Sequence, residues 1–244
     1  MKHLISLHDI SKDEIYEIFQ LAKKLKKDLK EGKEHKLLKG KTLGMIFTKS
    51  STRTRVSFET GMYQLGGYPL FLSSDDIQLG RGETIYDTAK VLSRYIDGIM
   101  IRTFNHKDVI DLAKYGTIPV INGLTDLMHP CQVLADLFTI IEKKDNLKGL
   151  KLAYIGDGNN MAHSLLHGCA KVGMDISVAT PKEFECDSLI VSEAIQDAKL
   201  SQPESSSCES SGPKIVLTNN PAEAIADADV VYTDTWVSMG QESE

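Results

Sequence analysis

The chain has 244 residues and a formal net charge of −6, with 41% hydrophobic residues. This length allows one large domain or two smaller ones, each with a real core. The negative charge argues against a general polyanion binder and leaves room for a local site that takes one small anion. No apolar run approaches the roughly 18 residues of a membrane span, and the start lacks a targeting segment, so we expect a cytoplasmic protein.

The four cysteines have no spacing typical of a metal site or of a redox pair. They are Cys131, Cys169, Cys186 and Cys208. In a chain without a leader we expect them to be reduced thiols rather than disulfides or zinc ligands.

The first predicted element is an amphipathic helix over residues 11–30, which opens with capping-box spacing between Ser11 and Glu14. Short apolar runs then alternate with helical patterns. The predicted strands are 42–47, 68–72, 98–101, 118–121, 152–155, 176–179, 215–218 and 230–233, and the helices between the first five begin near Ser51, Glu83, His106 and Pro130. This alternation predicts parallel sheets covered by helices, an α/β fold.

A domain boundary is expected near residues 146–149, between the long helix over 130–144 and a fresh strand. The prediction is two Rossmann-like βα domains, residues 1–146 and 147–244, joined by this linker helix, with the active site in the cleft between them. The segment QPESSSCESSG, residues 202–212, is Ser-rich and aperiodic, so we expect a surface loop.

The most informative segment is FTKSSTRTR, which follows a predicted buried strand and opens a helix. Its first turn carries alternating hydroxyl and guanidinium side chains, namely Ser51, Thr52, Arg53, Thr54 and Arg55. Helix starts bind anions through free N–H groups and the helix dipole, and Arg adds bidentate donors. Ordinary capping by Ser and Thr is the alternative. The arginines favour an anion because they oppose the dipole when none is bound, so we predict a small phosphate site.

Two further groups follow predicted strands. The loop DIQLGRGE contains Gly80 and Gly82, which suit a mobile closing segment, with Gln78 and Arg81 as groups that can reach a ligand. An ordinary turn before a helix explains this loop equally well. Arg102 ends the strand DGIMIR, and ligands of open α/β sheets lie beyond the carboxyl ends of strands. A surface ion pair is the alternative for Arg102.

The segment HPCQ opens the linker helix, with His129 at the cap, Pro130 at the first position and Gln132 at the third. Both polar side chains can point out of the helix start. Together they offer donors and an acceptor for a neutral carbonyl–amide group. A mutual cap between His129 and Gln132 is the alternative.

Two motifs in the second half suit a polar small molecule. GDGNN is half of a dinucleotide fingerprint, but Met161 stands at the third Gly position, so an NAD site is only weakly indicated. The paired amides of Asn159 and Asn160 fit a polar metabolite better. In DTWVSMG, Asp234 offers a carboxylate for an ammonium group, and Ser238 offers a donor for a carboxylate, a combination that matches an amino acid.

In this order, STRTR, DIQLGRGE, HPCQ, GDGNN and DTWVSMG resemble the motifs of ornithine carbamoyltransferases over essentially the whole chain. STRTR is shared with aspartate carbamoyltransferases, and the SMG loop marks the ornithine branch. The resemblance implies a transferase of arginine metabolism that makes citrulline and phosphate from carbamoyl phosphate and the δ-amine of L-ornithine. It implies a homotrimer or a multiple of trimers, with no cofactor, metal, nucleic acid or membrane partner.

The resemblance also implies a role for each motif residue. Those implied for the phosphate are Ser51, Thr52, Arg53 and Thr54. Those implied for the carbamoyl group are Arg102, which also reaches the phosphate, His129 and Gln132, with Gln78 supplied by a neighbouring subunit. Those implied for ornithine are Asn160, Asp234, Ser238 and the backbone of Met239. Arg102 and His129 are the implied catalytic residues, because they face the oxygen that becomes negative.

Family members continue past the SMG loop into an HCLP segment, whose Cys helps to bind ornithine, and no HCLP occurs in this sequence. We therefore expect a truncated chain that is weakly active or inactive alone. Three alternatives stay open. One is a carbamoyltransferase for another amine, such as aspartate, putrescine or an acetylated ornithine. The others are a non-catalytic carbamoyl phosphate binder and an NAD-linked enzyme.

Overall fold

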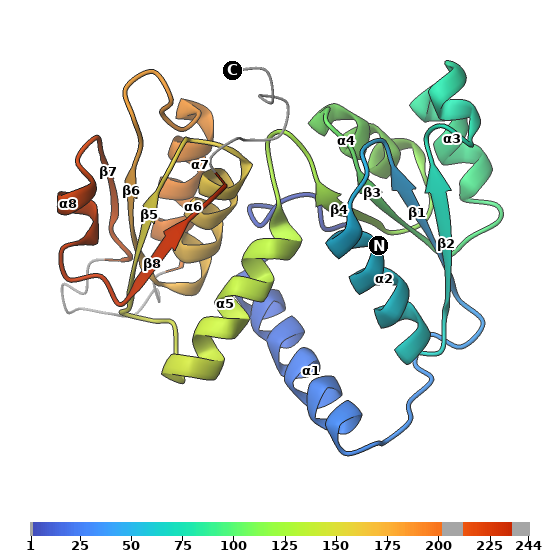
Figure 1. The fold of residues 1–244 in the computed structure, drawn as a ribbon, viewed down its shortest axis with the longest axis horizontal. Coiled ribbons are helices and arrows are strands. Elements are labelled where there is room, and N and C mark those ends of the chain that lie inside the picture. Colours follow the sequence, from blue (N-terminus) through green and yellow to red (C-terminus); the bar gives the residue numbers. More distant parts are fainter. Residues whose placement is uncertain (1, 202–211, 236–244) are drawn as a thin grey trace. The chain divides into compact units, whose positions relative to one another are not determined.

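The computed structural model describes residues 2–201 and 212–235 (Figure 1). By packing, the chain divides into two compact units. Unit 1 comprises Met1–Ile5 and Ile18–Asp126, and unit 2 comprises Ser6–Glu17 and Leu127–Glu244. The domain boundary expected between residues 146 and 147 stays a prediction. Among the described residues, none of the helices combines the length and the apolar composition that a bilayer crossing requires.

Unit 1 is a four-stranded parallel sheet with the order β2-β1-β3-β4. Its strands are β1 Thr42–Phe47, β2 Tyr68–Ser73, β3 Gly98–Arg102 and β4 Val120–Leu124, and its helices are α2 Thr52–Gln64, η1 Gln78–Arg81, α3 Ile85–Leu92 and α4 His106–Tyr115. The four strands predicted for this half are present. The fourth begins at Val120 rather than at 118, because Pro119 has no N–H to donate to the ladder.

The two faces of this sheet carry separate apolar clusters. Ile99 and Ile101 of β3 pack with α3 and α4 on one face. Met100, between them, packs on the opposite face against Met62 of α2. Successive side chains of a strand point to opposite faces, so a strand buried on both faces reads as a continuous apolar run. This is why the apolar runs located the strands.

Unit 2 is a second parallel sheet, with the order β7-β6-β5-β8. Its strands are β5 Lys151–Ile155, β6 Asp175–Ala179, β7 Ile215–Thr218 and β8 Val230–Thr233, and its helices are α5 Pro130–Lys144, α6 Asn160–Val172, α7 Ser188–Leu200 and α8 Pro221–Ile225. The predicted strands of this half are present as well. Residues 202–211 of the predicted Ser-rich loop lie outside the described residues.

Helix α1, Lys12–Lys30, begins in unit 2 and continues into unit 1. The predicted capping box is confirmed, since the Ser11 N–H donates to Glu14 Oε2 at 2.9 Å and the Glu14 N–H donates to Ser11 Oγ at 3.3 Å. The predicted apolar face is only partly buried. Ile15 is fully buried, whereas Ile18 is 40% exposed and Leu29 is 49% exposed. Periodicity gives the width of an apolar stripe but not how much of it a neighbour covers.

Each sheet has one point where the strand order reverses. In unit 1 the chain passes from β1 to β2 on one side, while β3 lies on the other. In unit 2 it passes from β5 to β6 on one side, while β8 lies on the other. Loops that diverge at such a point leave a crevice at the carboxyl edge of the sheet, where ligands of α/β proteins bind. STRTR and Arg102 lie at the first reversal, and GDGNN and Asp234 lie at the second.

Candidate functional site

The start of α2 combines a cap with an electropositive end. Ser51 has an extended backbone, and its Oγ accepts the Thr54 N–H at 3.3 Å. A hydroxyl that accepts this bond keeps its own hydrogen for another partner, so capping and anion binding are compatible. The first turn of α2 contains no acidic residue. No carboxylate of that turn therefore neutralises the positive end of the helix dipole.

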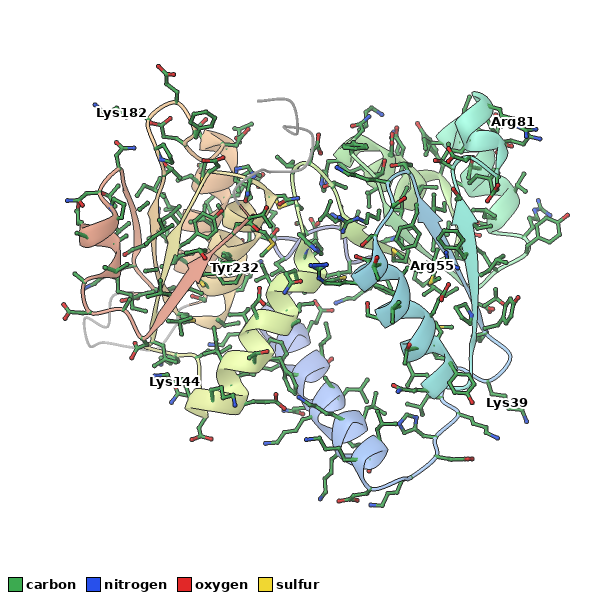
Figure 2. All side chains as sticks on the ribbon, in the orientation of Figure 1. Lys39, Arg55, Arg81, Lys144, Lys182 and Tyr232 are labelled. Atoms are coloured by element: carbon green, nitrogen blue, oxygen red, sulfur yellow. The ribbon has the colours of Figure 1, made fainter. Side chains whose placement is uncertain are left out.

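The two arginines of this turn differ in their surroundings. Arg55 Nε donates to Glu59 Oε1 at 2.9 Å, and the guanidinium lies 3.7 Å from the centroid of the Phe71 ring (Figure 2). Arg55 is therefore balanced by a residue one turn further along α2. Arg53 is exposed and has no ion pair with a residue that the structure describes. The argument that the arginines need an external anion thus applies to Arg53 and is wrong for Arg55.

A pocket of about 240 Å³ opens at the carboxyl edge of the unit 1 sheet. Ser51 and Thr52 line it from the start of α2, and Ser73 lines it from the end of β2. The strand register sets Phe47, Ser73 and Arg102 side by side at this edge. A hydroxyl-rich wall next to a helix start suits a small oxyanion.

Arg102 is the last residue of β3, and its Nη1 donates to Thr54 Oγ1 at 3.2 Å. The pairing of β3 with β4 shifts in register between Ile101 and Arg102, and such shifts re-aim a strand-end side chain. Arg102 Nε is buried without a hydrogen-bond partner among the described residues. Burial also lowers the pKa of the guanidinium. The alternative of a surface ion pair is wrong, because the described partner of Arg102 is a hydroxyl.

The DIQLGRGE loop forms a single turn of 3₁₀ helix, η1, which ends at Gly82 with φ 94°. A left-handed backbone of this kind favours glycine. Helix α3 follows, capped by Thr84, whose Oγ1 accepts the Asp87 N–H at 3.1 Å. Gln78 and Arg81 are exposed, and the walls of the 240 Å³ pocket come from other residues.

His129 and Gln132 do not cap each other. His129 stands at the N-cap of α5, where its side chain makes no capping bond and its N–H donates to Ser164 Oγ at 2.8 Å. Gln132 Nε2 instead donates to Asp136 Oδ1 at 2.9 Å, one turn further along α5. The mutual-cap alternative is therefore wrong. Burial raises the pKa of the neighbouring Cys131 thiol to about 12, so this thiol is not a nucleophile at neutral pH.

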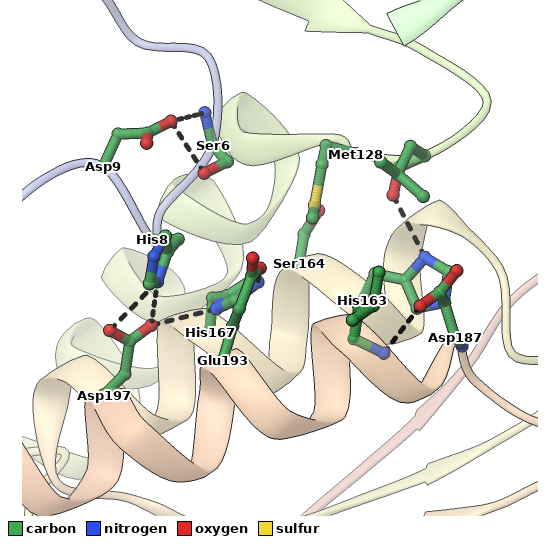
Figure 3. A network of polar contacts seen from close by, with 12 residues as sticks. Ser6, His8, Asp9, Met128, His163, Ser164, His167, Asp187, Glu193 and Asp197 are labelled. Atoms are coloured by element: carbon green, nitrogen blue, oxygen red, sulfur yellow. Dashed lines mark hydrogen bonds and ion pairs between the residues drawn. The ribbon is translucent and has the colours of Figure 1, made fainter.

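A buried histidine fixes the segment that leads to His129. His163 Nε2 accepts the Asp187 N–H at 3.0 Å, and Nδ1 lies 3.1 Å from the Leu127 carbonyl oxygen (Figure 3). Since Nε2 is an acceptor, the hydrogen must be on Nδ1, and the ring is neutral. Burial lowers the pKa of His163, which favours the same neutral form. The ring thereby connects α6 to the residues just before α5.

Asp234 lies at the end of β8 and is held from two sides. Its Oδ2 accepts from Asn159 Nδ2 at 2.7 Å, and its Oδ1 accepts the Thr235 N–H at 2.8 Å. Asn159 Oδ1 in turn accepts the N–H groups of Met161 and Ala162, at 2.9 and 3.3 Å, and so caps α6. The prediction from sequence named Asn160, the first residue of α6, as the site residue. It did not predict that Asn159 both caps α6 and holds Asp234. The signal available was the N-cap position of Asn159.

The glycine of GDGNN that precedes the asparagines has a packing role. A Cβ at Gly158 would lie 2.3 Å from the backbone nitrogen of Cys186, and the Gly158 N–H donates to the Phe184 oxygen at 2.7 Å. The close approach that only glycine permits is made to another loop of the protein. This accounts for the glycine without a dinucleotide. Ser238 and Met239, which follow Asp234, lie outside the described residues.

One group of residues outside these motifs has the geometry of a metal site. His8, His167 and Asp197 place potential ligand atoms within 4.8 Å of one another (Figure 3). Lys171 Nζ, however, lies 2.9 Å from Asp197 Oδ1. Burial opposes ionisation of Asp197, but bonds from His167, His8 and Lys171 outweigh it and hold its pKa below the usual range. An ammonium group already balances this carboxylate, so the group fits a structural ion cluster better than a cation site.

The predicted site residues divide between the units according to their place in the chain. Unit 1 contains Ser51, Thr52, Arg53, Thr54, Gln78 and Arg102, and unit 2 contains His129, Gln132, Asn160 and Asp234. Within unit 1 the structure joins Thr54 to Arg102, and within unit 2 it joins Asp234 to Asn159, the neighbour of the predicted Asn160.

Comparison with known proteins gives consistent matches over the whole chain. A family model described as "Aspartate/ornithine carbamoyltransferase, carbamoyl-P binding domain" matches residues 2–142, and one described as "Aspartate/ornithine carbamoyltransferase, Asp/Orn binding domain" matches residues 148–244. The ornithine carbamoyltransferase of Anoxybacillus flavithermus is 60% identical, over 100% of this chain and 74% of that protein. The one from Bacillus subtilis is 57% identical, over 100% of this chain and 72% of that protein. The solved ornithine carbamoyltransferase of Pyrococcus furiosus superposes with a TM-score of 0.91 at 53% identity, over 99% of this chain and 74% of that one.

Proposed function

The chain belongs to the ornithine carbamoyltransferase family, and we propose that its two units together hold the two substrates of one carbamoyl transfer, from carbamoyl phosphate to the δ-amine of L-ornithine. The family, the transferase class and the α/β fold predicted from the sequence are confirmed. Another amine acceptor, a non-catalytic binder and an NAD-linked enzyme are not favoured by these relatives.

The phosphate of carbamoyl phosphate binds at the carboxyl edge of the unit 1 sheet. Ser51, Thr52, Arg53 and Thr54 supply hydroxyl, guanidinium and backbone donors at the start of α2. The observation that carries this proposal is Arg102, a half-buried cation that bonds Thr54 at 3.2 Å and keeps an unused donor at Nε. A buried guanidinium without a carboxylate partner is costly unless an anion joins it.

The carbamoyl group lies between Arg102 and the start of α5. When the amine attacks, negative charge develops on the carbamoyl oxygen, and donors aimed at that oxygen stabilise the transition state. Arg102 supplies a guanidinium, and His129 supplies an imidazole at the positive end of a helix dipole. Gln132 contacts the amide side of the group. Bringing these residues together requires the predicted cleft between the two domains, which also orients the substrates and excludes water.

Ornithine binds at the carboxyl edge of the unit 2 sheet, through Asn160, Asp234, Ser238 and the backbone of Met239. The attacking amine must first lose a proton, and freeing an amine of lysine-like pKa costs about 4–5 kcal/mol at neutral pH. A carboxylate beside that amine would oppose the loss. Asp234, held by Asn159 at 2.7 Å, therefore serves to position the α-ammonium group rather than to act as the base.

We extend the proposal to assembly and location. Gln78 is exposed, and other residues form the walls of the 240 Å³ pocket of its own chain, which supports its reaching the carbamoyl phosphate of a neighbouring subunit in a homotrimer. A cytoplasmic location agrees with two substrates that are small charged metabolites.

The direct test is product formation. The chain is incubated with carbamoyl phosphate and each of ornithine, aspartate, putrescine and acetylated ornithine, and the carbamoylated products are separated and counted. The proposal predicts citrulline as the dominant product, formed at the weak activity expected of this chain. A rate with ornithine no higher than with the other amines would contradict it.

A further inference from the structure

Gln132 and Asp136 lie four residues apart on α5, so they share one face of the helix. Gln132 Nε2 donates to Asp136 Oδ1 at 2.9 Å. An ionised carboxylate can only accept hydrogen bonds, so it admits one orientation of the Gln132 amide, with the NH₂ group toward Asp136. The Gln132 carbonyl oxygen then points away from Asp136 and is the amide atom available to a ligand.

Asp136 is itself held by strand β8. The hydroxyl of Tyr232 lies near Asp136 and, as a donor, favours the ionised carboxylate. The Tyr232 ring stacks on Tyr154, with 6.1 Å between the ring centroids. Tyr154 is fully buried, and its hydroxyl donates to the Asp157 carbonyl oxygen at 3.0 Å. Tyr154 thus supports the ring of Tyr232, while Asp136 Oδ2 is buried without a hydrogen-bond partner among the described residues.

Burial raises the pKa of Asp136, while the Gln132 amide and the nearby Tyr232 hydroxyl oppose that rise. A partly buried carboxylate with one oxygen left unpartnered is costly to keep for packing alone. Such a carboxylate has a purpose if it sets the orientation of the Gln132 amide.

We propose that Asp136 is a positioning residue that turns the Gln132 carbonyl oxygen toward the substrate, where it accepts from the NH₂ group of the carbamoyl moiety. The inference deepens the proposed function and rests on it, because it takes Gln132 as a contact of carbamoyl phosphate. With the Gln132 amide reversed, two NH₂ groups would face each other and both would lose a partner. Asp136 thereby makes the site selective for a carbamoyl group over an acyl group of the same shape.

Two stable phosphonates test this selectivity. Phosphonoacetamide presents the carboxamide, and acetonylphosphonate replaces its NH₂ by a methyl group of similar size. Sites that hydrogen-bond a donor discriminate strongly against an analogue that lacks it. By titration calorimetry, the native chain is expected to bind the amide about tenfold or more tightly than the ketone. In Asp136→Ala this ratio falls toward one, while the affinity for the ketone is retained.

Three further variants separate positioning from general damage. Glu142→Ala removes an acidic side chain from the same helix and keeps the native ratio. Tyr232→Phe removes only the hydroxyl that faces Asp136 and gives an intermediate ratio, which preserves the test if Asp136→Ala folds poorly. In a Gln132→Ala background, Asp136→Ala changes the ratio no further, because the partner through which it acts is gone.

The possible results separate a failure of the positioning role of Asp136 from a failure of the proposed function. If the native chain prefers the amide and both Asp136→Ala and Tyr232→Phe keep that preference, the positioning role is overturned and the proposed function stands. If Asp136→Ala lowers the ratio equally with and without Gln132, the role is likewise overturned. If the native chain binds neither phosphonate, the proposed function fails and the inference fails with it.

Discussion

Arg102→Met separates binding from folding at the most informative residue of unit 1. Met has a similar length and no charge, so it preserves much of the packing. The substitution removes the 3.2 Å bond to Thr54, worth about 1 kcal/mol. It also removes a half-buried cation whose ionised form burial disfavours, as the lowered pKa of Arg102 indicates. These effects oppose each other, so the free energy of unfolding of the ligand-free chain is expected to stay within about 1 kcal/mol of the native value.

Ligand binding is expected to respond differently. A charge-assisted hydrogen bond contributes about 1.5–3 kcal/mol, and the bound anion would take the free Nε donor and a second guanidinium donor. The affinity of Arg102→Met for phosphonoacetamide should therefore fall about a hundredfold or more. Titration calorimetry gives the affinity, and urea unfolding without ligand gives the stability.

Lys41→Met is the matched control for this experiment. It removes a positive charge from the residue just before β1, at the opposite edge of the same sheet, where Lys41 Nζ pairs with Asp97 at 2.8 Å. Its effect on phosphonate affinity should be small. The reasoning is refuted if Arg102→Met binds phosphonoacetamide within about threefold of the native chain, or if it loses more than about 2 kcal/mol of stability.

Three more predictions concern unit 2. Asn159→Asp replaces the amide that lies 2.7 Å from Asp234 by a second carboxylate, which repels Asp234. This variant should bind ornithine about tenfold or more weakly and should bind phosphate unchanged; equal losses for both ligands would argue against the prediction. Cys131, with a pKa of about 12, is roughly one part in ten thousand thiolate at pH 8, so mass spectrometry should find it alkylated far more slowly in the folded chain than in urea; equal rates would contradict this. Because the pKa of His163 is lowered in the folded chain, this residue takes up a proton at a higher pH when the chain is unfolded. The free energy of unfolding should therefore fall below about pH 6.5, and less so in His163→Gln; parallel losses in urea titrations would exclude this cause.

Features that depend on local sequence were predicted well. Strands buried on both faces leave apolar runs, and a capping box is a contact between residues three apart, so β1 and the start of α1 could be located directly. The pairing of Arg55 with Glu59 is also local, at i and i+4, but it was missed, although its spacing could have indicated it.

Features that depend on strand order could not be predicted in the same way. Asn159 and Asp234 are 75 residues apart and meet because β8 pairs with β5 rather than with β7. Alternation of strands and helices gives parallel sheets but does not specify which strands are neighbours. The contact between Tyr232 and Asp136 has the same origin, since it needs β8 beside α5. Polar residues of this kind carry no periodic signal, and only the fold brings them together.

The central claim is that one site is formed from both units, and a bisubstrate conjugate tests it most directly. In this ligand a phosphonoacetyl group is joined through an amide to the δ-nitrogen of ornithine. The account predicts that the conjugate binds much more tightly than phosphonoacetamide or ornithine alone, because one ligand then engages both units. It also predicts that Arg102→Met in unit 1 and Asp234→Asn in unit 2 each weaken its binding. An affinity no higher than that of phosphonoacetamide, insensitive to Asp234→Asn, would show that the two units do not share a site.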